Sequence, residues 1–230
     1  MEEAWIFQLR SDYERETMMA DEDKVFQKRI QLLFEHDRVV RSHAIYEATA
    51  IERMIESVIA WHFCPDQERH LSFTSLMFVS TEVMLRKKID ILEQLLENYY
   101  PDILKDLPNI INDLHSVRRF RNKFAHDELI LDEEKVKKDG IWLRSVNRKG
   151  KVVEDFISSE EANARIKAAQ TVKWYVFYLS LEIQNRVQGK DPNQLRFMVD
   201  LIKSGAWDKA IDDSQRAKDE TVPAEASAEK

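Results

Sequence analysis

The sequence predicts an all-α protein: an antiparallel helical bundle with a small β-hairpin insertion at about residues 141–156. Long stretches carry apolar residues at the three- and four-residue spacing of an α-helix. Only four Gly and five Pro occur in 230 residues, too few for the many tight turns of an all-β sandwich. Hydrophobic residues make up 43% of the chain, which is enough for a packed core.

The first predicted helix spans residues 22–62. Uninterrupted, it would be about 60 Å long, so we expect a bend or break near Asp37–His43, where polar residues interrupt the apolar stripe. A second helical run covers Ser72–Tyr99, and Pro101 ends it. A third covers Leu107–Ala125, with Pro108 in its first turn.

The pattern changes at residues 141–156, where two β-prone segments flank a turn containing Gly150. Helical spacing returns at Ser159, a candidate N-cap, and continues to Val187, with Gly189 as the stop signal. A shorter amphipathic helix follows Pro192.

These patterns divide the chain into four segments. Residues 1–21 are an N-terminal extension and residues 22–188 the helical bundle. Residues 189–213 hold an accessory helix. Residues 214–230 are rich in Ala, Glu and Lys and predict a disordered tail, since they offer too little apolar surface to offset the entropy of ordering.

Charge and composition exclude several classes of protein. A net charge of -7 argues against a general DNA-coating protein, although a local basic groove stays possible. Cys64 is the single cysteine, which excludes an intramolecular disulfide and a cysteine-based zinc site. There is no glycine-rich phosphate loop and no metal-ligand spacing, so we expect no cofactor and no metal. With no secretory signal and no apolar run near the ~20 residues that span a bilayer, we expect a cytoplasmic protein without a membrane partner.

The most informative segment is Arg121-Asn122-Lys123-Phe124-Ala125-His126, at the end of the third predicted helix. From His115 to His126 the chain has no Asp or Glu, although acidic residues outnumber basic ones 42 to 35 overall. A cationic spot of this kind attracts an anion, most plausibly a phosphate. The cations that could contact RNA are Arg118, Arg119, Lys123, Arg148 and Lys149, the last two in the hairpin turn. For the hairpin pair, an ordinary charged turn is an equally good interpretation.

Spacing limits how Arg121 and His126 can act together. Five residues apart, they lie about 140° apart around an ideal helix. They can meet on one ligand only if the helix loosens near Ala125 or if a second subunit completes the site. Another Arg-x4-His pair, Arg38 and His43, lies inside the first predicted helix, and we interpret it as coincidence.

The Arg-polar-x3-His run near the end of a helix resembles the signature of the HEPN superfamily, small helical domains found in RNases, toxins and antiviral systems. The resemblance covers roughly residues 22–188 and implies metal-independent RNA cleavage by a homodimer. It implies that His126 is the general acid or base, that Arg121 holds the scissile phosphate, and that Asn122 orients that phosphate or the imidazole. A histidine suits this role because its side chain exchanges protons near neutral pH. An antitoxin or regulatory protein is a possible further partner.

Two alternatives stay open. The first is a non-catalytic HEPN-like regulator that binds a nucleotide or a protein, similar to mannitol-repressor-like proteins, which carry a comparable Arg-Asn…Ala-His run. The second is a plain helical interaction module in which Arg121 and His126 cap a helix and pair with Asp127, Glu128 or Asp132.

Overall fold

The protein is mostly helical, with a small three-stranded antiparallel sheet. The computed structural model describes residues 2–79, 83–147, 149–190, 194–204 and 206. Of these, 76% are helical. The predicted helical class with one hairpin is therefore confirmed at this level. The proposed tail at residues 214–230 lies outside the described residues.

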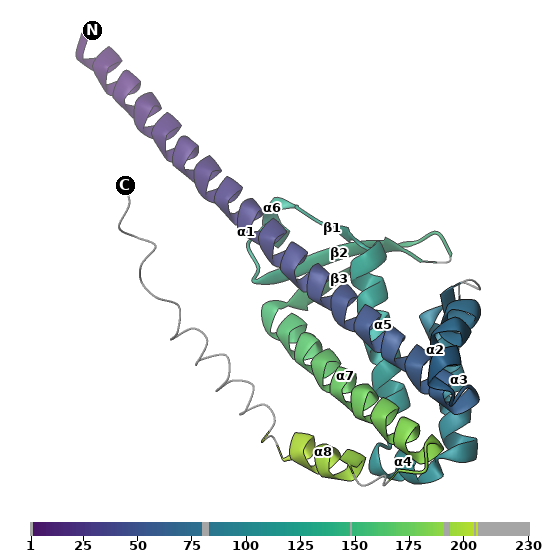
Figure 1. Cartoon of the computed structure of the whole chain (residues 1–230). Helices are drawn as coiled ribbons and strands as arrows, with labels where there is room; N and C mark the ends of the chain where they lie inside the picture. The colour runs from purple at the N-terminus through teal and green to yellow at the C-terminus, as the bar shows by residue number, and fades with distance from the viewer. Residues whose placement is uncertain (1, 80–82, 148, 191–193, 205, 207–230) are drawn as a thin grey trace, which may run out of the picture. The chain divides into compact units, whose positions relative to one another are not determined.

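Figure 1 shows the order of the elements along the chain. The helices are α1 (Glu2–Phe63), α2 (Gln67–Thr74), the π-helix η1 (Ser75–Val79), α3 (Leu85–Tyr99), α4 (Pro101–Asp106), α5 (Ile110–His126), α6 (Glu133–Val136), α7 (Ser159–Val187) and α8 (Gln194–Lys203). The strands are β1 (Glu128–Leu129), β2 (Gly140–Val146) and β3 (Val152–Ser158). No described helix combines the length and the apolar character needed to cross a membrane.

The chain forms two compact units, each made of two separate segments. The sheet unit comprises Met1–Glu47 and Arg119–Ala168, and the helical unit comprises Ala48–Arg118 and Ala169–Lys230. Each unit has its own buried apolar cluster. The helices α1, α5 and α7 each contribute residues to both units.

The sheet unit is built on strand order β1-β2-β3, with β1 and β3 both antiparallel to β2 (Figure 1). Leu129 pairs with Leu143, and Trp142 pairs with Phe156. Buried residues of α1, α5, β2, β3 and α7 form its core: Val40, Ala44, Phe120, Phe124, Ile141, Leu143, Ile157 and Ala162. The last turns of α5, the helix that carries Arg121 and His126, are thus held in this unit by their apolar side.

The helical unit packs the C-terminal part of α1 with α3, α4, the first turns of α5 and the second half of α7. It also holds a buried charge cluster, in which the Lys88 ammonium donates to Glu52 Oε1 (2.6 Å) and Glu56 Oε1 (2.5 Å). Burial by itself lowers the pKa of Lys88, but the hydrogen bonds to the two carboxylates outweigh it and leave the pKa raised.

The predicted break at Asp37–His43 is wrong, because α1 runs without interruption from Glu2 to Phe63. No Gly or Pro lies in this stretch. The polar residues there also stabilise the helix, since Asp37 and Arg41 form an i, i+4 ion pair of 3.1 Å. Val40 and Ala44 are buried beside this pair on the same side of the helix, where Asp37 is also buried.

The second predicted helix is also not continuous. It is replaced by α2, the π-helix η1 and α3. Met84, just before α3, has an extended backbone with φ -63° and ψ 148°, which ends any helical path at that residue. In the sequence, apolar residues keep their helical spacing between η1 and α3, so the pattern does not show that the helix is broken there.

The elements after residue 140 have nearly the bounds that the sequence predicted. The helix α7 has the predicted bounds, Ser159–Val187, and Gly189 ends it with φ +69°. The cap is one residue earlier than predicted: the Glu161 N–H donates to Ser158 Oγ (3.1 Å). The hairpin turn contains Gly150 with φ +73°.

Candidate functional site

Arg121, Asn122 and His126 lie in the last two turns of α5, and the apolar residues between them determine where they point. Phe120 and Phe124 are buried, and their rings meet edge to face at 4.9 Å. Because these phenylalanines occupy the core side of the helix, the polar residues take the outer positions. His126 is exposed, whereas Arg121 and Asn122 are partly buried.

The Arg121 guanidinium is oriented by its neighbour. Its Nη1 donates to Asn122 Oδ1 at 3.0 Å. Among the residues that the structure describes, Arg121 forms no ion pair with a carboxylate. A guanidinium has five N–H donors, so most of them stay available to a bound anion.

The helix is regular up to His126, because the Asp127 N–H still donates to the Lys123 carbonyl at 2.9 Å. The helix therefore does not loosen near Ala125, and a single chain does not bring Arg121 and His126 together in that way. Within the described part of the chain, no hydrogen bond joins these two side chains. Of the two routes to a shared ligand, completion by a second subunit stays open.

The predicted RNA-contacting cations have different surroundings. Arg119 and Lys149 are exposed, and the Lys149 backbone N–H donates to Asn147 Oδ1 (2.9 Å) in the hairpin turn. Lys123 forms an ion pair with Asp155 of β3. Arg118, which falls in the helical unit, is partly buried, and its Nε has no hydrogen-bond partner in the described chain. Arg148 lies outside the described residues.

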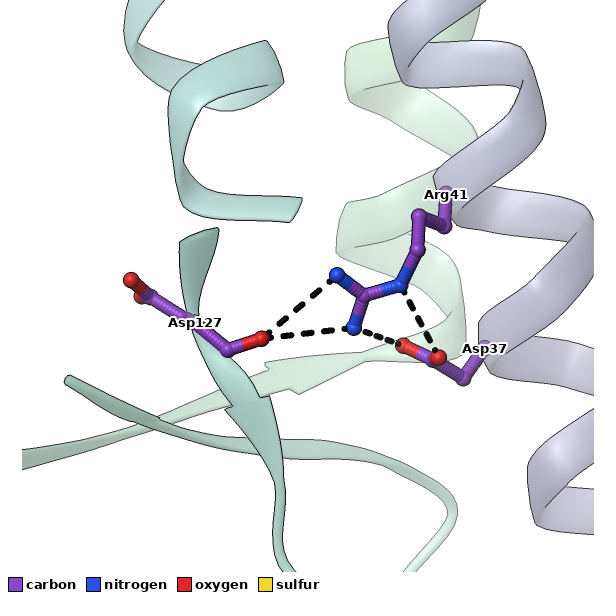
Figure 2. Close-up of polar contacts among 3 residues, drawn as sticks. All are labelled: Asp37, Arg41 and Asp127. Carbon is purple, nitrogen blue, oxygen red and sulfur yellow. Dashed lines mark hydrogen bonds and ion pairs between the residues drawn. The ribbon is translucent and has the colours of Figure 1, made fainter. Parts of the chain in front are cut away.

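Arg41 contacts the end of the motif helix, and the sequence did not single it out. Figure 2 shows its guanidinium between Asp37 and the main chain at Asp127. Nε and Nη2 donate to the two oxygens of Asp37 at 3.1 Å, and Nη2 and Nη1 reach the Asp127 carbonyl oxygen at 3.4 and 3.5 Å. The guanidinium carbon also lies 5.9 Å from the centre of the Phe124 ring.

These contacts place a cation on α1 at the negative end of the α5 dipole, where backbone carbonyls lack helical partners. The last turn of α5, which carries His126, is thereby attached to α1. The i, i+4 spacing of Asp37 and Arg41 was the available signal, and it predicts the ion pair but not the contact with Asp127.

The carboxyl next to His126 is poorly solvated. Burial raises the pKa of Asp127, and the charge of Lys123 offsets this only in part. Asp155 acts in the same direction as burial. The end of α5 thus combines the imidazole with a carboxyl group that ionises less readily than usual.

The pairings required by a plain interaction module are not present in the described chain. Among the described residues, neither Arg121 nor His126 forms an ion pair with Asp127, Glu128 or Asp132. Asp132 instead contacts Lys135 at 3.3 Å.

No family model, curated protein or solved structure matches the chain. The likeness to the HEPN superfamily accordingly rests on the residues of the motif and on the order of the elements around it.

Proposed function

We propose that the protein is a metal-independent endoribonuclease of the HEPN type, a helical bundle that acts as a homodimer in a toxin or antiviral defence setting. One observation carries the proposal. In the last two turns of α5, an exposed His126 accompanies an Arg121 whose guanidinium is bonded to the Asn122 amide and, among the described residues, to no carboxylate. Such a guanidinium keeps its charge available for a phosphate.

The chemistry requires one base, one acid and one anion-stabilising group. His126 removes the proton of the ribose 2′-OH, and the 2′ oxygen attacks the adjacent phosphorus. Arg121 stabilises the negative charge that develops on the phosphoryl oxygens. Departure of the 5′ oxygen, with a proton from an imidazolium, leaves a 2′,3′-cyclic phosphate and a 5′-hydroxyl end.

The regular end of α5 explains why two copies are needed. Arg121 and His126 diverge by about 140° on a regular helix, so one chain cannot close both side chains over the same phosphate. In a two-fold dimer the second copy can present its own Arg121 or His126 across the interface.

The test is cleavage of total RNA in EDTA, with mapping of the new ends. Wild type should yield 2′,3′-cyclic phosphate ends, and His126→Ala should lose at least a hundredfold in rate, the usual contribution of a general acid–base group being about 10²–10⁴-fold. His43→Ala is the matched control, because His43 is an exposed histidine of the other Arg-x4-His pair. Equal cleavage by wild type and His126→Ala would reject the mechanism.

A non-catalytic HEPN-like regulator is the second candidate, and the ion pair between Lys123 and Asp155 favours it. This pair reduces the positive potential that would attract RNA to the motif. Such a regulator would bind a nucleotide or a protein with equal affinity as wild type and as His126→Ala, without cleaving RNA.

A further inference from the structure

A second cationic site lies in the sheet unit, in a depression of about 440 Å³ lined by α1 and by the segment that connects α6 to β2. The α1 wall includes Arg29 and His36, and the opposite wall includes Lys137 and Lys138. The remaining lining is Leu32, Leu33, Val136, Asp139, Gly140 and Ser159. Three fixed cations thus face one carboxylate, in a chain whose net charge is -7.

Much of this positive charge is not neutralised. Within the described ranges, Arg29, His36 and Lys138 form no ion pair. Lys137 is bonded to Glu134 Oε1 (3.0 Å). The Asp139 carboxylate accepts a hydrogen bond from Ser159 Oγ (2.6 Å), which occupies part of its acceptor capacity.

Lys138 is held in place without losing its charge. Its ammonium lies 5.2 Å from the centre of the Trp142 ring and 5.9 Å from that of Phe156. Cation–π contacts orient an ammonium but leave its formal charge intact. The site is thus partly organised before any ligand binds.

The depression lies near the Arg121–His126 motif in the sheet unit. His36 is followed directly by Asp37, which holds Arg41 against the Asp127 carbonyl at the end of α5. Along α1, His36 and Arg41 are separated by about 8 Å, at 1.5 Å per residue. The depression is therefore close to the end of α5 that carries His126.

We infer that this depression is a phosphate subsite, and that Arg29 and Lys138 bind a backbone phosphate of the RNA strand on one side of the scissile position. The inference rests on the proposed function. Phosphates are its ligand because Arg29 and Lys138 line it without ion pairs in the described chain, while the neighbouring aliphatic side chains and the lack of a deep enclosure suit a strand that passes over the surface.

The test is RNA binding, measured by fluorescence anisotropy of a labelled 12-nucleotide RNA in EDTA over a range of salt concentrations. All proteins carry His126→Ala, so that cleavage does not interfere. Adding Arg29→Gln and Lys138→Gln should weaken binding about tenfold at 0.1 M salt and lower the slope of log K against log salt by about 1.4, or 0.7 for each lost contact to a single strand.

The matched control is Arg53→Gln with Lys87→Gln, which removes two exposed cations outside the depression and changes the net charge equally. Circular dichroism melts verify folding, and Arg29→Gln alone, at an exposed position, should show about half of the slope change. If the depression variant binds RNA as tightly as the control variant, the subsite is overturned, while RNA cleavage by the wild-type protein would still support the proposed function.

Two further binding measurements, with inorganic phosphate and with a mononucleotide, show whether the depression binds a free anion or the backbone of an RNA strand. If both bind the parent protein and lose affinity in the depression variant, while the 12-nucleotide RNA does not bind at all, the RNA assignment is wrong. The proposed function would fail with it in that case, and cleavage assays would independently show no activity.

Discussion

At the scale of single residues, Arg38 and Arg41 lie three positions apart on α1 and differ in what they contact. Arg41 is bonded to Asp37 and to the Asp127 carbonyl, and its side chain is 27% exposed. Arg38 is exposed and, in the part of the chain that the structure describes, has no ion pair. We expect Arg41→Ala to lower the free energy of unfolding by about 2 kcal/mol, because it leaves the buried Asp37 carboxylate without its ion-pair partner.

Urea denaturation of Arg41→Ala and Arg38→Ala measures this difference. The Arg38 variant should stay within about 0.5 kcal/mol of wild type, as usual for a surface substitution. Similar losses in both variants would show that the contacts of Arg41 with Asp37 and Asp127 contribute nothing specific to stability.

The candidate residues could be found from the sequence because a run of cations without acids and the Arg-polar-x3-His spacing are local features. Arg41 could not be found that way. Its contact with Asp127 spans 86 positions, and no pattern within one helix shows which distant carbonyl a side chain will meet. The same holds for Lys123, whose pairing with Asp155 depends on where β3 lies.

At the scale of elements, the hairpin contains two glycines with positive φ and different surroundings. Gly140 has φ +147°, and a Cβ there would lie 2.4 Å from the Ile157 carbonyl oxygen, whereas Gly150 has φ +73° and open space around it. We expect Gly140→Ala to destabilise the protein by about 3 kcal/mol and Gly150→Ala by about 1 kcal/mol.

Thermal or urea unfolding of the two variants, followed by circular dichroism, gives the comparison. Gly150→Asn should cost less than Gly150→Ala, since asparagine tolerates the left-handed conformation. A Gly140→Ala protein as stable as Gly150→Ala would mean that β2 and β3 can shift at this position without penalty.

The elements that the sequence predicted well have clear local signals, such as glycines, at their ends. The helix α7 ends at a glycine with positive φ, and the hairpin has a glycine in its turn. The elements that were missed lack such signals: β1 is two residues long, and α3 is separated from η1 without Gly or Pro. For α1, helix length suggested a bend or break, but the helix is continuous, and the Asp37–Arg41 pair and the buried Val40 support it there.

At the scale of the whole molecule, the proposed dimer predicts complementation between two inactive variants. Arg121→Ala and His126→Ala each lack one group, but a mixed dimer has one intact Arg121 and one intact His126 on different copies. Unfolded together in equal amounts and refolded, they should recover about a quarter of the wild-type RNase activity, because half of the dimers are mixed and each has one complete pair.

Each variant refolded alone is the control and should stay inactive. Mixing Arg121→Ala with the double variant Arg121→Ala, His126→Ala should also restore nothing. Mixed samples as inactive as the single variants, with dimers present by analytical ultracentrifugation, would contradict a site shared between copies.

The division of the chain into two units also has a consequence for its synthesis on the ribosome. All residues of the sheet unit are made once translation passes Ala168, whereas the helical unit still needs the segment that begins at Ala169 and includes buried Ile183 and Val199. Since a growing chain folds as its segments emerge, the part that carries His126 can assemble while its neighbour is incomplete. Until that segment emerges, the apolar residues of Ala48–Arg118 that pack against it stay uncovered, and such surface makes a nascent chain prone to aggregation.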